Sequence, residues 1–329
     1  MVERRPRMIP SRPGRPPRRP SERQITRRRV AALAALVLAL GGLGWAAVTA
    51  IGGGSPHATP TRTAASSLIY STEEITTNGK TTQTVIAMPK PFHVVFPEGF
   101  TIADMAARVH AVAKIAQRER HVHPILTTRG YLAAVREATP PPCVSHAGRA
   151  MEGFLFPATY EFFAKTASRE LVQEQLTTFC QNWQQVDLSY ARTKNLTPYD
   201  VLIIASMIEK ETLSPDERPL VAAVIYNRLH KRMALQIDAT LRYGLKIPPT
   251  QSITESELSS QSPYNTRHRL GLPPTPIANP GLASMQAAAH PANVNYLYYV
   301  RKPDKKHHFF TASIVAFQHY EATHGYGTH

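Results

Sequence analysis

The sequence predicts an α+β protein with a single N-terminal transmembrane helix. Residues 30–51 form a 22-residue run without charge, and no second apolar run of spanning length follows. Further on, polar capping residues precede helical segments, most clearly at Thr197-Pro198-Tyr199-Asp200. Two β-rich runs, 296–301 and 307–311, flank the polar turn 302–306, as in a hairpin. Helices and short strands of this kind, without a βαβ alternation, favour the α+β class.

The N-terminal tail, residues 1–29, carries most of the positive charge. It contains eleven Arg and two acidic residues, a net charge of +9 out of +15 for the whole chain. With six Pro and few apolar residues, it cannot bury enough surface to offset the entropy of ordering, so we expect a disordered tail. A basic segment beside a membrane span attracts the anionic lipids of the inner leaflet. Nucleic-acid binding is not expected, because the folded part lacks a basic motif.

Residues 30–51 are long enough to cross the hydrocarbon core, which takes about 20 residues in a helix. A cleaved signal peptide is the alternative, although its apolar region is usually only about 7–15 residues long. The Arg-rich flank places the N-terminus in the cytoplasm by the positive-inside rule. The sequence therefore predicts a single-pass protein of the cytoplasmic membrane with its folded part outside the cytoplasm.

Two cysteines, Cys143 and Cys180, lie in the part expected to be exported. An oxidising compartment would allow one disulfide, worth about 3–4 kcal/mol. Two unpaired buried thiols are the alternative, and the spacing matches neither a metal site nor a redox motif.

The segments that follow the span divide into a linker and a small subdomain. Residues 52–89 are interpreted as a linker with leading strands, since Gly, Ser, Thr and Pro dominate its start. Residues 90–150 predict an α/β subdomain with a strand at 92–96 and a helix at 102–117, capped by Thr101 and Asp104. The string VVFPEGFTIADMAARV resembles the opening of LysM-type glycan-binding modules, and a plain spacer domain is the alternative.

Three helices are expected after the boundary marked by Pro140–Pro142 and Gly148. The first spans about 168–184 with Ser168 as its cap, and the second runs from Pro198 to about Thr212. The third is capped by Asp216, carries Pro219 in its first turn and extends to about Lys231.

Glu209 is the candidate catalytic residue, because it follows eight almost entirely apolar residues, 201–208. On a helix it shares a stripe with Leu202, Ala205 and Thr212. A carboxylate at the end of such a stripe is partly removed from water, which suits a general acid. A helix-end Glu paired with a nearby Arg or Lys is the alternative interpretation.

A set of hydrogen-bonding side chains follows Glu209 along the chain. Neutral donors and acceptors with one or two acids suit a sugar site, whereas ordinary turn and cap chemistry could explain each residue singly. The set comprises Asn227, Arg228, Gln236, Asp238, Thr240, Tyr264 and Asn265. The His residues near the C-terminus lack metal-site spacing, so neither a metal nor a cofactor is expected; they are His307, His308, His319, His324 and His329.

Long stretches of residues 151–291 resemble the YceG-like family of endolytic murein transglycosylases. The stretches are MEGFLFPATYEF (151–162), IASMIEKETLSPDERPLVAAVIYNRL (204–229), LQIDATLRYGL (235–245) and SPYNTRHRLGLPPTPIANPGLASMQAAAHP (262–291). The resemblance implies a mixed α+β catalytic domain over 151–329, with Glu209 of the EKET string as catalyst. It also implies that Glu211, Asn227, Arg228, Gln236, Asp238, Thr240, Tyr264 and Asn265 line the substrate site.

The resemblance further implies lytic cleavage within nascent peptidoglycan strands, limiting their length beside peptidoglycan synthases in the same membrane. Ordinary glycosidases need two carboxylates. In a lytic reaction the 6-hydroxyl of N-acetylmuramic acid attacks its own anomeric carbon, so Glu209 alone can donate one proton and accept the other. Two alternatives stay open: a hydrolytic muramidase that also uses Asp238, and a non-catalytic scaffold that binds glycan and synthases.

Overall fold

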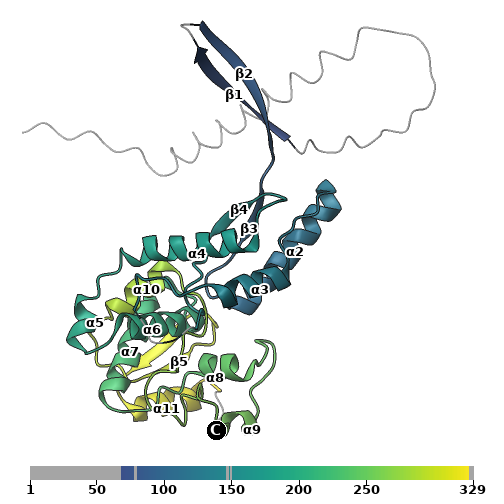
Figure 1. The fold of residues 1–329 in the computed structure, drawn as a ribbon. Coiled ribbons are helices and arrows are strands. Elements are labelled where there is room, and N and C mark those ends of the chain that lie inside the picture. The colour runs from purple at the N-terminus through teal and green to yellow at the C-terminus, as the bar shows by residue number, and fades with distance from the viewer. Residues whose placement is uncertain (1–67, 78–79, 146–147, 149, 326–329) are drawn as a thin grey trace, which may run out of the picture. The chain divides into compact units, whose positions relative to one another are not determined.

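The computed structural model describes residues 68–77, 80–145, 148 and 150–325. They form helices and three two-stranded antiparallel sheets, as the α+β prediction requires (Figure 1). The predicted tail (1–29), the predicted span (30–51) and residues 52–67 lie outside the described residues. Within the described part, no helix is both long and apolar enough to cross a bilayer.

The helices and strands follow in chain order. They are β1 (Leu68–Thr77), β2 (Lys80–Pro89), β3 (Phe92–Val95), α2 (Ile102–Arg120), α3 (Thr128–Glu137), β4 (Thr159–Phe162), α4 (Ser168–Trp183), α5 (Ser189–Thr193), α6 (Pro198–Glu211), the 3-10 turn η1 (Pro215–Glu217), α7 (Arg218–His230), α8 (Asp238–Leu245), α9 (Glu255–Leu258), α10 (Leu282–Ala289), β5 (Tyr298–Arg301), β6 (His308–Thr311) and α11 (Ile314–Thr323).

The strands predicted before residue 90 form a hairpin of β1 and β2, with Leu68 opposite Pro89 and Thr77 opposite Lys80. The second sheet pairs β3 with β4, and Phe92 lies opposite Phe162. Because β4 comes from the segment assigned to the catalytic domain, this sheet joins the two regions that the sequence divides near residue 150.

The predicted capping box at the start of α2 is present. The Thr101 side chain accepts a hydrogen bond from the Asp104 backbone, and the Asp104 carboxylate accepts one from the Thr101 backbone at 2.9 Å. The helix extends to Arg120, three residues beyond the predicted end. On its buried side, Met105 and Val109 contribute to the core.

The central helix α6 begins as predicted and is buried on every side. Thr197 and Asp200 form a reciprocal capping box, and Pro198 occupies the first turn, where its missing N–H is harmless. All eight residues of 201–208 are buried. A helix that is apolar all round belongs in a core, and here α7 and α10 pack against it.

Two predicted caps are wrong. Ser168 is the first residue inside α4, and the extended residue Ala167 precedes it without a side-chain cap. Asp216 lies within η1, because residues 215–217 form a tight 3-10 turn before α7 starts at Arg218. The predicted position of Pro219 in the first turn of α7 is confirmed.

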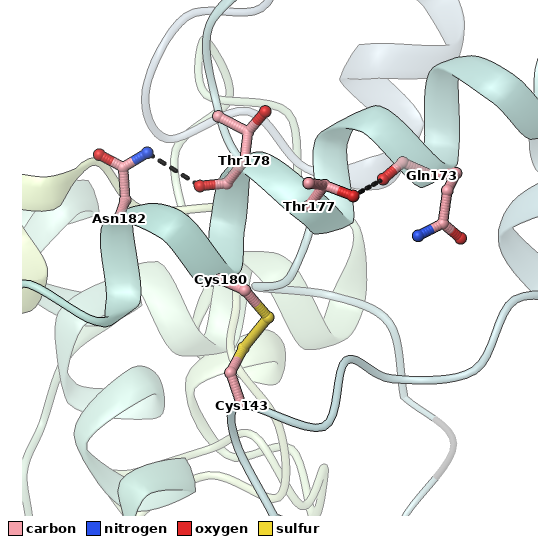
Figure 2. Close-up of a disulfide and its surroundings, with 6 residues drawn as sticks. All are labelled: Cys143, Gln173, Thr177, Thr178, Cys180 and Asn182. Carbon is pink, nitrogen blue, oxygen red and sulfur yellow. Dashed lines mark hydrogen bonds between the residues drawn. A yellow bond between two sulfur atoms is a disulfide. The ribbon is translucent and has the colours of Figure 1, made fainter.

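The hairpin near the C-terminus is confirmed, with β5 and β6 in antiparallel register from Tyr298–Thr311 to Arg301–His308. The question left open for the cysteines is resolved in favour of pairing. Cys143 and Cys180 form a disulfide whose Cα atoms lie 5.8 Å apart (Figure 2). It ties the loop after α3 to α4, so it connects the small subdomain with the helical part.

Candidate active site

Glu209 occupies the last turn of α6, with only 7% of its side chain exposed. Its Oε2 atom accepts a hydrogen bond of 3.0 Å from the backbone N–H of Gly281, which directly precedes α10. The carboxylate is therefore fixed by a backbone donor from a segment 72 residues further along the chain.

Arg218 lies between Glu209 and a second carboxylate, Glu98. One guanidinium nitrogen is 3.9 Å from Glu209 Oε1 and 3.9 Å from Glu98 Oε2. The Nε atom of Arg218 donates to Ser284 Oγ at 3.1 Å, so α10 helps to hold the guanidinium. We call Glu98, Glu209, Arg218 and Gly281 the Glu209 centre.

Glu98 comes from the turn 97–100 between β3 and α2, which is fastened to the helical part. Gly99 N–H donates to Asn279 O, and Asn279 N–H donates to Phe100 O, both at 2.9 Å. Lys210 Nζ donates to Gly99 O at 3.2 Å. Gly99 has a φ of +77°, which side-chain-bearing residues rarely adopt. The turn is thus held in one position against α6.

Asn279 and Glu152 form a buried network behind this turn. Asn279 Oδ1 accepts from the N–H groups of Gly153 and Leu155, and its Nδ2 donates to Glu152 Oε1 at 2.8 Å. Glu152 also accepts from Ile102 N–H and from the Tyr243 hydroxyl. Burial raises the pKa of Glu152 to about 7, although these hydrogen bonds oppose the rise.

Glu211 lies only two residues from Glu209 but in different surroundings. Residues two apart project roughly 200° apart around a helix. The Tyr299 hydroxyl donates to Glu211 Oε2 at 3.3 Å. Burial raises the pKa of Glu211, the negative charge of Asp238 adds to the rise, and the positive charge of Arg301 opposes it. Glu211 therefore belongs with Asp238, away from the Gly281 N–H.

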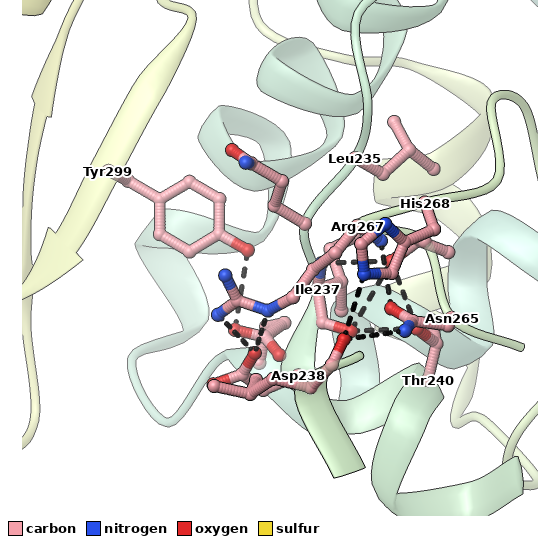
Figure 3. Close-up of polar contacts among 12 residues, drawn as sticks. Leu235, Ile237, Asp238, Thr240, Asn265, Arg267, His268 and Tyr299 are labelled. Atoms are coloured by element: carbon pink, nitrogen blue, oxygen red, sulfur yellow. Dashed lines mark hydrogen bonds and ion pairs between the residues drawn. The ribbon is translucent and has the colours of Figure 1, made fainter. Parts of the chain in front are cut away.

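A group of polar side chains surrounds Asp238 (Figure 3). Arg267 donates to Asp238 Oδ1 through Nη2 at 2.7 Å and through Nε at 3.2 Å. Arg228 donates to the carbonyls of Ala234, Leu235 and Leu297 and to Gln236 Oε1. We call Glu211, Arg228, Asp238, Arg267 and Tyr299 the Asp238 cluster.

The other predicted site residues make bonds within the protein. Asn227 Nδ2 donates to the carbonyls of Val294 and Tyr296. The Thr240 hydroxyl donates to Ile237 O and lies 3.0 Å from the Thr266 hydroxyl. Asn265 Nδ2 donates to Leu258 O and Ser260 O. The Tyr264 hydroxyl lies 2.7 Å from the Thr275 hydroxyl. Their proposed contacts with substrate stay predictions.

Sequence reasoning missed Glu98, Arg218 and Gly281, although each lies in a string that it singled out. Glu98 stands between Pro97 and Gly99, a composition typical of a tight turn, which gives no sign of a contact more than 100 residues away. Among the described side chains, no group of three or more His, Cys, Asp and Glu is arranged to hold a metal ion.

Comparisons with known proteins point to one family. A sequence model of the YceG-like family matches residues 64–322. An endolytic murein transglycosylase from Bacillus subtilis is 36% identical over 152 residues, covering 46% of this chain and 42% of the relative. One from Streptococcus pneumoniae is 31% identical over 223 residues, covering 62% of this chain and 39% of the relative. The chain thus spans about two fifths of the length of these relatives.

A crystal structure of a YceG-like protein from Listeria monocytogenes has the same fold over most of both chains. The TM-score is 0.60 at 25% identity, with 73% of this chain and 85% of the other covered. The family match extends over both the small subdomain and the helical part that holds Glu209. This chain belongs to the YceG-like family.

Proposed function

We propose that this chain is an endolytic peptidoglycan lytic transglycosylase with Glu209 as its proton donor. One observation carries the proposal: Glu209 is a nearly enclosed carboxylate, oriented by the Gly281 N–H, beside Arg218 and the half-exposed Glu98. A carboxyl group held in a fixed position can protonate a leaving oxygen as a general acid. The names of the curated relatives, endolytic murein transglycosylases, support the same activity.

The reaction breaks the β-1,4 bond between N-acetylmuramic acid and N-acetylglucosamine. Glu209 gives its proton to the departing O4 atom as the C1–O4 bond breaks. The 6-hydroxyl oxygen of the same N-acetylmuramic acid forms the new bond to C1, and its proton passes to a carboxylate. The product is a 1,6-anhydro end, and no water is consumed. Glu209, ionised by the first step, is chemically able to receive the second proton.

The proposed setting follows from the N-terminal sequence. Residues 30–51 would anchor the chain in the cytoplasmic membrane, and the Arg-rich tail would touch anionic lipids on the cytoplasmic side. The LysM-like subdomain would then meet glycan outside the cytoplasm. An enzyme held there can cut nascent strands near peptidoglycan synthases and so limit strand length.

Product analysis on purified glycan strands tests the function. The full chain should yield anhydro ends by mass spectrometry, and Glu209→Gln should lower the rate at least about 100-fold, because an amide cannot protonate the leaving oxygen. Reducing ends from the parent protein would instead identify a hydrolase.

A non-catalytic scaffold is the competing class of function. It would bind glycan strands and synthases through the same domains without cutting. A deletion strain carrying Glu209→Ala separates the two possibilities: an enzyme's variant fails to complement the deletion, whereas a scaffold's variant restores normal growth and strand length.

A further inference from the structure

Glu98 reaches the Glu209 centre from a different part of the chain. The turn 97–100 belongs to the small subdomain between β3 and α2, yet two backbone hydrogen bonds with Asn279 and one with the Lys210 side chain fasten it beside α6. A Cβ atom built on Gly281 would collide with the Glu98 carboxylate. Both carboxylates thus contact Gly281, Glu209 through the backbone N–H and Glu98 through the space that a Cβ atom would occupy.

The charged groups facing Glu98 come from two helices. Glu209 lies on α6 and Arg218 begins α7, whereas Lys210, also on α6, donates to the neighbouring Gly99 carbonyl. Arg218 is 3.9 Å from each carboxylate, which is longer than a direct hydrogen bond. The exposures of the two carboxylates differ: 48% of the Glu98 side chain is exposed, against 7% for Glu209. Glu98 is the more accessible of the two acids to an entering sugar.

We propose that Glu98 is the second carboxylate of the active centre and the base that receives the 6-hydroxyl proton, while Glu209 protonates the leaving oxygen. This inference rests on the proposed lytic function. It makes the small subdomain part of the catalytic apparatus, since the centre is incomplete without the turn 97–100.

The proton balance closes within the site. The proposed step starts with one proton on Glu209 and with Glu98 as the carboxylate. The O4 atom takes the proton of Glu209 as the C1–O4 bond breaks, and Glu98 takes the proton of O6 as the C1–O6 bond forms. Afterwards Glu98 is protonated and Glu209 is ionised. One proton moving from Glu98 to Glu209, directly or through solvent, restores the starting state.

The surroundings of Glu98 suit a base. Partial burial raises the pKa of Glu98, a negative charge on Glu209 adds to the rise once that group has given up its proton, and Arg218 opposes it. A carboxylate with a raised pKa holds a proton more strongly than an ordinary one, and the nearby guanidinium still favours the ionised form.

Matched variants of the full chain test the role. Glu98→Gln keeps the shape but cannot accept the proton, so kcat on glycan strands should fall about 100-fold with little change in KM. Glu119→Gln is the control, because Glu119 is an exposed Glu of the same subdomain, at the far end of α2. Its kcat should match that of the parent protein.

The pH profile separates a base from a structural residue. In the parent protein kcat should fall on the acidic side as Glu98 becomes protonated, and this fall should be absent in Glu98→Gln. Parental kcat and an unchanged acidic fall in Glu98→Gln would overturn the inference while leaving the lytic function intact, provided that anhydro ends still form. A parent protein that forms no anhydro ends would defeat the proposed function itself.

Discussion

The Glu209 centre and the Asp238 cluster hold their charged groups at different distances. Arg267 donates two hydrogen bonds to Asp238, the shorter at 2.7 Å, and Arg228 is bonded to several carbonyls. In the Glu209 centre the guanidinium of Arg218 stays 3.9 Å from both carboxylates. Close, direct bonds fix one arrangement of the chain, whereas looser contacts leave oxygen atoms able to meet a substrate.

The difference indicates that the residues on two sides of α6 have different roles. Glu209 faces Gly281 and Arg218, whereas Glu211 bonds to Tyr299 from β5. The Asp238 cluster holds the segment after α7 and the strand β5 in place. The Glu209 centre is the place where chemistry is expected. The following variants probe this contrast.

The largest expected loss of stability comes from Arg228→Ala. Arg228 is 7% exposed and donates to three backbone carbonyls, which would lose a charged donor in a buried place. The free energy of unfolding should fall by about 3 kcal/mol in urea titrations. A fall under about 1 kcal/mol would mean that the close bonds of the cluster do not stabilise the fold.

A pH-dependent effect, no larger than that of Arg228→Ala, is expected from Glu152→Gln. Since the pKa of Glu152 rises from 4.5 to about 7 on folding, the folded state binds the proton more tightly than the unfolded state. Its contribution to stability is therefore full below about pH 4.5 and is lost as the pH rises to about 7. The variant should remove this pH-dependent change in unfolding free energy, which a pKa rise of this size limits to about 3 kcal/mol.

Thermal unfolding of the parent protein and of Glu152→Gln across pH 4–8 measures how the stability of each depends on pH. If Glu152 is the group that titrates, the unfolding free energy of the parent protein should fall more steeply between about pH 4.5 and 7 than that of the variant. Identical slopes throughout would assign the pH dependence to other carboxyl groups, such as Glu98 or Glu211, whose pKa values are also raised.

The smallest effect is expected from Asp238→Asn. The Asp238–Arg267 pair is short, but 49% and 36% of the two side chains are exposed. Exposed pairs contribute up to about 1 kcal/mol, and salt screens them. The loss of unfolding free energy should therefore stay below about 1 kcal/mol and shrink in 1 M NaCl. A rise in KM at unchanged stability would support the predicted contact of Asp238 with substrate.

Local sequence signals predicted local structure well. Thr101 and Thr197 form the capping boxes that their spacing indicates, and the polar turn 302–306 separates two paired strands. Ser168 and Asp216 are wrong as caps because a capping side chain alone does not decide where the first turn begins. The extended residue Ala167 takes the capping position of α4, and the 3-10 turn Pro215–Glu217 precedes the first residue of α7.

The sequence alone does not predict which distant residues contact one another in the site. Periodicity predicts that Glu209 ends an apolar stripe, but it carries no information on which loop lies opposite. Glu98, Arg218 and Gly281 meet there because β3 pairs with β4 and α10 packs on α6, and both are tertiary events. Glu211 is expected in the substrate site because of the family resemblance alone, and its contact with substrate stays a prediction.

The most direct measurement compares Glu209→Gln with Glu211→Gln in kcat on purified glycan strands. The two substitutions are chemically identical and two residues apart on one helix, so they differ only in surroundings. We expect Glu209→Gln to lose at least about 100-fold and Glu211→Gln to keep more than roughly a tenth of the parental kcat. A folded Glu209→Gln protein that matches the parent, or a larger loss at Glu211, would contradict the assignment of the active centre.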